Sequence, residues 1–361
     1  MNNKAHNYYI DFWKFVFSLI IVIYHSWVFN GEYGNGLFNK GYLATIFYFV
    51  VTGYLMMNSI SKEKDNQDNI GISTFNFLKK KFLSLLPYLT ISFVIGYILV
   101  YRRSGISLPI LFSNNTIAEF FQLGIFGYTL NINSSWWYIS AMLFCLAFLY
   151  PLAKKYKESF KYIIVPLIIL LVIALIKFKG INIYDPLGIT FIFANGFYKG
   201  IIFICLGVVS YIISDYLKKI QLNTIQKIVL TIMETGIYLF LIYNMNELMI
   251  GTVLAGALFT IAIALSFSNQ CYSSKIFTSS LFPKLAKFGF LMFLNNCAIR
   301  KFLLSRNYSF SYLKLLLIFL VLNIIVAAIL YFIIDILYKK IKLIKNNNKK
   351  NKLDNNILRK R

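Results

Sequence analysis

The sequence predicts an all-α membrane protein built as a bundle of about ten transmembrane helices. Of its 361 residues, 58% are hydrophobic and only 14% are charged, and the mean hydropathy is +0.66. Soluble domains are less apolar and carry about 25% charged residues. The formal charge of +24 could indicate nucleic acid, but the bases lie between apolar runs and form no basic face, so no nucleic-acid partner is expected.

Ten apolar runs are close to the length that a helix needs to cross a bilayer. They cover residues 10–29, 41–60, 82–101, 135–153, 162–178, 191–213, 225–243, 248–268, 284–303 and 312–337. The first run is not expected to be a cleavable signal, because it is long and no small-residue cleavage site follows it.

The basic residues predict the orientation of these spans, because lysine and arginine are enriched in cytoplasmic segments. With the N-terminus inside, 27 of the 37 bases fall on cytoplasmic segments. Both termini are therefore expected in the cytoplasm. Residues 1–338 would form one transmembrane domain. Residues 339–361 would form a basic tail, disordered or lying on the membrane surface, since this segment is too polar to bury a core.

The first span is apolar except for a polar stripe. Asp11, Lys14, Ser18 and His25 are spaced by three, four and seven residues, which places them on one helix face. Ionisable groups are costly in lipid, so the stripe is expected to face protein or a water-filled cavity. Lys14 and His25 would lie roughly 16 Å apart along the axis. His25 is either a functional group or a hydrogen-bonding partner of a neighbouring helix.

Other conspicuous residues allow two interpretations each. The run Lys79, Lys80 and Lys81 is either a cytoplasmic anchor or an anion site. Trp136 and Trp137 open a span, where they would form an interfacial aromatic belt or a surface for stacking a sugar. Glu234 falls within the seventh span and is expected to face the interior. The four cysteines form no metal-binding pattern and are predicted to be buried small side chains.

The order of several segments resembles the acyltransferase-3 family of polytopic membrane acyltransferases. The resemblance begins with Asp11-x-x-Lys14, ten residues and His25, followed by "FYFVVTGYLM". It continues through "FLKKKFLSLLPYL", "SSWWYISAMLFCLAFLYPL", "NGFYKGIIFICLGVVSYII" and "LAKFGFLMFLNN". Lys14, Lys81 and Ser84 stand where the family usually has arginine, and Asn296 stands at its late histidine position.

This resemblance implies transfer of an acyl group, usually acetyl, from cytoplasmic acyl-CoA to a hydroxyl of a capsular polysaccharide, exopolysaccharide or lipopolysaccharide. Acetyl-CoA would be a co-substrate, and neither a permanently bound cofactor nor a metal is expected. The resemblance implies that His25 is the general base. Asp11 is the second catalytic candidate. It lies about four helical turns from His25, so it would act by positioning Lys14.

Lys14, Lys79, Lys80 and Lys81 would hold the phosphates of CoA as point charges, without the bidentate fork of arginine. Trp136 and Trp137 are the candidates for contacting the glycan. The expected location is the cytoplasmic membrane of a bacterium, with the lipid bilayer, acyl-CoA and a glycan as partners.

Three other functions compete with this prediction. A transporter or flippase for a lipid-linked or polymeric glycan would share the span count and the polar cavity, but it would be expected to show broken helices in corresponding places of two halves. A membrane O-acyltransferase with a late catalytic histidine is excluded, because His6 and His25 both lie in the first tenth of the chain. A purely structural scaffold would leave the polar stripe unexplained.

Overall fold

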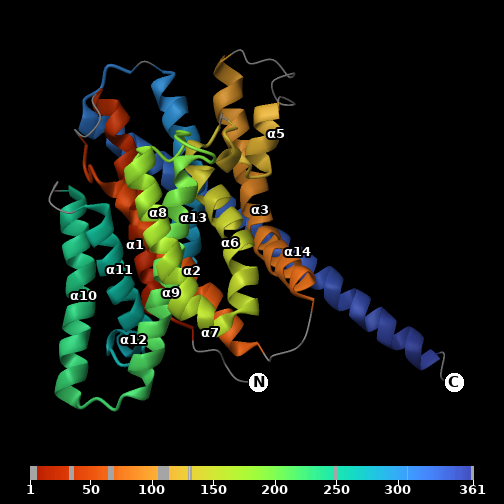
Figure 1. Cartoon of the computed structure of the whole chain (residues 1–361). Coiled ribbons are helices and arrows are strands. Elements are labelled where there is room, and N and C mark those ends of the chain that lie inside the picture. Colours follow the sequence, from red (N-terminus) through yellow and green to blue (C-terminus); the bar gives the residue numbers. More distant parts are fainter. Residues whose placement is uncertain are drawn as a thin grey trace.

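The computed structural model describes residues 6–31, 36–63, 69–104, 114–128, 130, 132–246, 251–306 and 308–358. In these ranges the chain is mostly helical and forms no strand; an isolated bridge joins Ile189 and Ala194. The helices run side by side as a bundle (Figure 1). The predicted all-α, polytopic class is confirmed.

The helices connect in a simple order along the chain. They are α1 (Tyr8–Tyr24), η1 (His25–Asn30), η2 (Gly41–Leu43), α2 (Ala44–Lys62), α3 (Ile70–Ser104), α5 (Asn114–Phe120), η3 (Gly124–Phe126), η4 (Ser134–Trp136), α6 (Trp137–Lys155), α7 (Lys157–Ser159), η5 (Phe160–Ile164), α8 (Val165–Lys179), α9 (Asn195–Lys219), α10 (Thr224–Asn246), α11 (Thr252–Phe267), α12 (Ser273–Ile276), α13 (Leu281–Leu304) and α14 (Tyr312–Leu358).

Eight helical segments of the described chain are long and apolar enough to cross a membrane, against the ten that the sequence predicts. The predicted spans 248–268 and 284–303 account for the difference. The first forms α11, which has 16 residues and is therefore only about 24 Å long. The second forms α13, which carries Lys284, Lys287, Arg300 and Lys301. Many of its side chains are buried in the bundle, and a helix surrounded by protein does not need a lipid-compatible surface.

The last helix is longer than predicted. α14 continues through Leu358, so the backbone of residues 339–358 is helical where the sequence predicts a disordered or surface-lying tail. Extending an existing helix avoids the unfavourable nucleation step, and lysine has a good helix propensity. This part of α14 extends away from the bundle (Figure 1).

The tightest helix crossing in the core joins α2 to α9. A Cβ atom added to Gly53 would collide with the backbone carbonyl of Ile204 and lie 3.0 Å from the Cα of Gly207. A Cβ added to Gly207 would meet the Gly53 Cα at 2.8 Å and would collide with the Val50 carbonyl. Small residues at such crossings let two helix backbones touch. The glycine of "VTGYLM" is therefore a packing residue.

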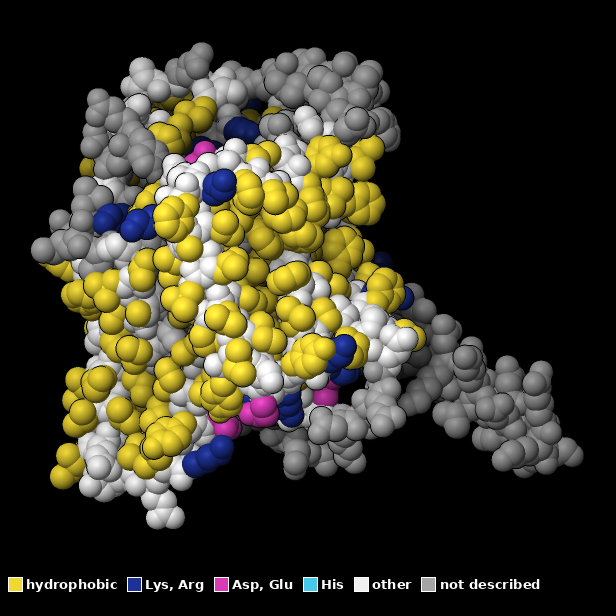
Figure 2. Space-filling model, viewed as in Figure 1, with side chains coloured by type: hydrophobic (Ala, Val, Ile, Leu, Met, Phe, Trp, Pro, Cys, Tyr) yellow, Lys and Arg dark blue, Asp and Glu magenta, His cyan; other side chains and the backbone are white. Residues whose placement is uncertain are grey.

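The surface agrees with a bundle that sits in lipid. Hydrophobic side chains cover the middle of the face shown in Figure 2, and charged side chains gather towards its ends. On α8, Leu167, Leu170 and Leu171 are all exposed by about 60% or more, which is costly in water but favourable in a bilayer.

Both ends of the chain lie at the same end of the bundle (Figure 1). That this end faces the cytoplasm stays a prediction from the distribution of bases. A reporter enzyme fused after Arg361 should therefore be active when it is a type that works only inside the cell. Activity of a fused reporter that works only outside the cell would contradict this orientation.

Candidate active site

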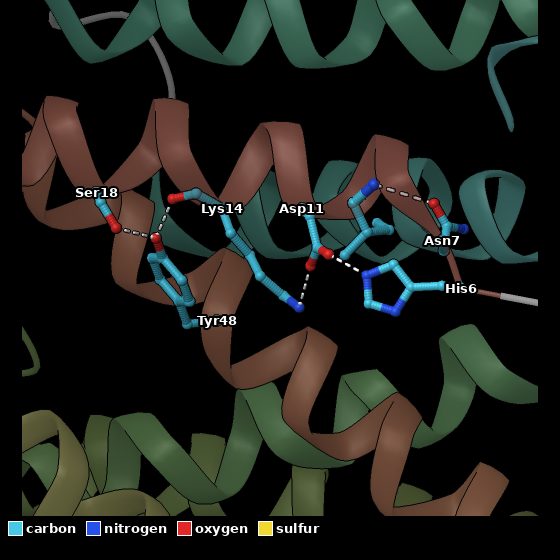
Figure 3. A network of polar contacts seen from close by, with 7 residues as sticks. His6, Asn7, Asp11, Lys14, Ser18 and Tyr48 are labelled. Atoms are coloured by element: carbon cyan, nitrogen blue, oxygen red, sulfur yellow. Dashed lines mark hydrogen bonds and ion pairs between the residues drawn. The ribbon is translucent and has the colours of Figure 1, made fainter. Parts of the chain in front are cut away.

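The polar stripe of α1 begins with a charged network at the end of the bundle that holds both termini. Asn7 caps α1 by accepting a hydrogen bond from the Ile10 amide at 3.0 Å. Asp11 is 4% exposed. Its Oδ1 accepts a bond from the Lys14 ammonium at 2.8 Å, and its Oδ2 contacts Nε2 of His6 (Figure 3). A carboxylate in the first turn is also favoured by the helix dipole. Asp11 thus pairs with Lys14; that it acts in catalysis by positioning this lysine stays a prediction.

A tyrosine on α2, Tyr48, contacts the polar stripe at Lys14 and Ser18. The Tyr48 hydroxyl donates to the Lys14 carbonyl at 2.5 Å and lies 2.6 Å from the Ser18 Oγ (Figure 3). These contacts hold α1 and α2 in register. Sequence reasoning missed both Tyr48 and the contact of His6. Tyr48 lies within the "FYFVVTGYLM" segment, but an aromatic residue in an apolar run gives no signal of a polar contact.

Lys14 and Ser18 line a cavity of about 230 Å³, here called the inner cavity. Its other walls come from α2, α3, α6 and α13 and are mostly apolar, with Leu85, Ile139 and Phe290 among them. An apolar chamber with one cation at its edge suits a ligand with an uncharged chain and an anionic end.

His25 lines a second cavity of about 190 Å³, here called the outer cavity. Ile21, Thr45 and Phe293 line both cavities, so the two chambers adjoin along the stripe of α1. The polar and aromatic residues of the outer cavity are Tyr24, His25, Trp27, Tyr42, Thr45, Ser134, Ser135, Trp137, Tyr184, Lys199 and Arg300.

His25 stands where α1 ends and η1 begins. Its backbone amide caps α1 by bonding to the Ile21 carbonyl. The Nδ1 atom is buried and has no well-formed hydrogen bond to the described residues. Nδ1 of His25 therefore forms no hydrogen bond to a neighbouring helix in the described part of the chain, and the choice between a functional role and a packing role for the imidazole stays a prediction.

The structure separates the three lysines that were predicted to bind CoA with Lys14. Lys81 is half-buried and close enough to Lys14 and Lys80 to interact with their charges. Lys79 and Lys80 are exposed. Lys80 lines a separate cavity of about 510 Å³ between the ends of α2, α3 and α6. Lys81 thus lies within electrostatic range of Lys14, whereas Lys79 is on the surface.

The two tryptophans predicted to contact a glycan occupy different environments. Trp137 lines the outer cavity with His25. Trp136 is fully buried, and its indole N–H donates to the Leu294 carbonyl at 3.0 Å. Trp136 therefore anchors η4 to α13, and it lines neither the inner nor the outer cavity.

Sequence reasoning missed three residues that shape the outer cavity. Lys199 on α9 and Arg300 on α13 line it. Glu119 on α5 is fully buried, and its carboxylate accepts the amide of Asn133 at 2.6 Å and that of Ile132 at 2.9 Å. These two hydrogen bonds hold the backbone of Ile132 and Asn133, immediately before Ser134 and Ser135. The signal for Lys199 was present, since it is a lone cation within an apolar run.

Glu234 is buried, as predicted, but it lies outside both cavities. Its Oε2 accepts a hydrogen bond from the Ser273 hydroxyl at 2.6 Å. This contact ties α10 to α12, so the carboxylate has a structural partner there.

A family model described as an acyltransferase domain matches residues 7–334, nearly the whole chain. The match includes the polar stripe of α1 and every residue that lines the two cavities. No curated protein and no solved structure matches the chain significantly. Because the domain match covers nearly the whole chain, this chain belongs to the acyltransferase-3 family of membrane acyltransferases.

Proposed function

We propose that this protein transfers an acyl group, most simply acetyl, from acyl-CoA to a hydroxyl of a cell-surface or exported glycan. The observation that carries the proposal is the pair of adjoining cavities on one face of α1, with Lys14 at one and His25 at the other. Acyl-CoA would approach from the end that holds both termini, and the glycan from the opposite end.

The inner cavity supports the donor half of the reaction. The anionic phosphates of CoA would remain near Lys14 and Lys81 at the mouth, where Asp11 holds the Lys14 ammonium in place. The uncharged pantetheine arm would occupy the apolar chamber. Lys14 and His25 are separated by roughly 16 Å along the helix axis, which is the distance that the arm has to cover.

The outer cavity supports the acceptor half. A sugar hydroxyl is a weak nucleophile, and a neutral imidazole is suited to take its proton during attack. Because Nδ1 of His25 is buried, Nε2 is the nitrogen assigned to the substrate. The hydroxyl oxygen forms the new ester bond as His25 takes its proton. The carbon–sulfur bond of the thioester then breaks, and the sulfur of CoA takes the proton from the imidazolium, so that CoA leaves as the thiol and His25 returns to its neutral form.

Aromatic side chains support a carbohydrate as the acceptor. Tyr42, Trp137 and Tyr184 line the outer cavity. Tyrosine and tryptophan combine a flat apolar face with a polar edge, and they match the apolar faces and hydroxyl rim of a sugar ring. The competing transporter hypothesis would give no reason for the acyltransferase domain match.

The proposed function is tested by comparing surface polysaccharides from cells with and without this gene, before and after mild alkali. Because O-acyl esters are labile to base, an ester signal should be present with the gene, absent without it, and removed by alkali. An identical ester content in both strains, with normal protein levels, would overturn the proposal.

Lys14 offers a test of the donor site. Lys14→Ala should raise the KM for acyl-CoA with little change in kcat, because a contact to the phosphate is made equally in the ground and transition states. Lys14→Arg should keep or improve activity. Lys155→Ala is the matched control, an exposed lysine of α6 outside the inner cavity. If Lys14→Ala leaves the acyl-CoA dependence unchanged, Lys14 is an anchor and the phosphate role is wrong.

A further inference from the structure

The outer cavity contains two cations with no acidic partner among the described residues. Lys199 comes from α9 and Arg300 from α13, and neither forms an ion pair within the described part of the chain. Lys199 is only 1% exposed. Burying a charge is costly unless it is paired, and within a membrane such residues mark functional sites. The arginine keeps its charge in any protein environment.

The contacts of Lys199 offset only part of the cost of burying its charge. Its ammonium has three protons to donate, and the described acceptor is the Tyr42 carbonyl at a long 3.4 Å. The ammonium also lies 5.2 Å from the ring centre of Tyr42 and 5.6 Å from that of Trp137, within the range of cation–π attraction. A small anion in the cavity would provide the acceptor that the protein does not.

The position of Lys199 along α9 brings it no stabilisation from the helix dipole. It is the fifth residue of the helix, near the end at which the dipole favours anions and not cations. A lysine that served only to anchor the helix would be more stable at the opposite end, where Lys218 and Lys219 lie. The helix dipole therefore does not offset the cost of burying Lys199.

We propose that the outer cavity binds an anionic group of the acceptor, so that the substrate is an acidic saccharide bearing a carboxylate or a phosphate. This inference rests on the proposed function. In the proposed function the phosphates of CoA bind at Lys14, which lines the inner cavity. Lys199 and Arg300 line the outer cavity, so they are not needed for the phosphates of CoA. Because His25, Lys199 and Arg300 line one cavity of about 190 Å³, the acylated hydroxyl belongs to the sugar unit that carries the anion or to its neighbour.

The test uses the purified full-length protein in lipid nanodiscs with labelled acetyl-CoA. The acceptor is polysaccharide from cells that lack the gene. One sample is untreated, one has its carboxyl groups reduced to alcohols, one has phosphate removed by hydrofluoric acid, and mock-treated samples serve as controls. One of the two anion-removing treatments should lower kcat/KM for the acceptor at least tenfold, and which one does so identifies the anion. Equal use of all samples would overturn the inference.

Two variants test whether the outer cavity is responsible for the preference for an anionic acceptor. Lys199→Met and Arg300→Gln should each raise the KM for untreated polysaccharide about tenfold, leave the KM for acetyl-CoA unchanged, and reduce the preference for the anionic acceptor. Lys179→Met, which removes an exposed lysine of α8, should behave like the unmodified protein.

The remaining outcomes separate the inference from the function on which it rests. A fall in kcat alone, equal for all acceptors, would assign the two cations to the transition state and contradict an acceptor site. An unchanged preference in folded variants would make them structural and also overturn the inference. Failure of the unmodified protein to transfer acetyl to any sample would instead count against the proposed function.

Discussion

Replacing His25 by glutamine should lower glycan acylation by about 10²–10⁴-fold, the usual contribution of a general base. Glutamine can form hydrogen bonds but cannot take a proton near neutral pH. The substitution therefore removes proton transfer and keeps a polar side chain in the outer cavity. The measurement is base-labile ester formed per unit of purified protein, with acetyl-CoA as the donor.

Two controls keep this experiment interpretable. The amount of protein in the membrane and its unfolding temperature should match those of the unmodified protein, since Nδ1 of His25 makes no well-formed hydrogen bond to described residues that the substitution could break. The KM for acetyl-CoA should also stay the same, because the phosphates are assigned to Lys14. Near-normal acylation by His25→Gln would remove the main chemical support for the proposed mechanism.

Gly53→Ala should destabilise the bundle by about 1–3 kcal/mol or more, the range for overpacking a close-fitting contact. The added methyl group would collide with the backbone carbonyl of Ile204, which belongs to a helix and cannot rotate away. The helices α2 and α9 would have to move apart. The measurement is the unfolding temperature of the purified protein in detergent.

The matched control is Gly236→Ala, also within a helix. An added Cβ at Gly236 meets nothing within 4 Å, and alanine has a better helix propensity by roughly 1 kcal/mol. Gly236→Ala should therefore unfold at the same temperature as the unmodified protein or slightly higher. Equal unfolding temperatures for the two alanine variants would contradict the proposed role of Gly53.

Much of the fold was predictable because membrane helices are determined by local composition. Each predicted span contains a helix in the described part of the chain, and Lys14, Ser18 and His25 of the polar stripe line two cavities. The exceptions have physical causes. A hydropathy pattern cannot distinguish a helix that faces lipid from one enclosed by protein, as α13 is. It also does not show that a basic tail will continue an existing helix, as α14 does.

The site was predictable only where polar residues interrupt an apolar run on one helix. Asp11 and Lys14 lie on α1, and His25 follows it as the first residue of η1, so their spacing in the sequence was enough to place them along one face. Lys199 and Arg300 come from two other helices, and their proximity to His25 depends on the crossings of α1 with α13 and of α2 with α9. Trp136 and Trp137 are adjacent in sequence, but the turn from η4 to α6 directs them to different environments.

The contact between Gly53 and Gly207 has a mechanical consequence. Because the backbones of α2 and α9 touch there, these two helices resist sliding or separating and form a stiff unit. Thr45 on α2 and Lys199 on α9 both line the outer cavity, so their spacing is fixed by this unit. Any widening that admits a polymer or releases a product therefore has to come from movement of the other walls of the outer cavity, such as α13 or the segment that carries Tyr184, against this unit.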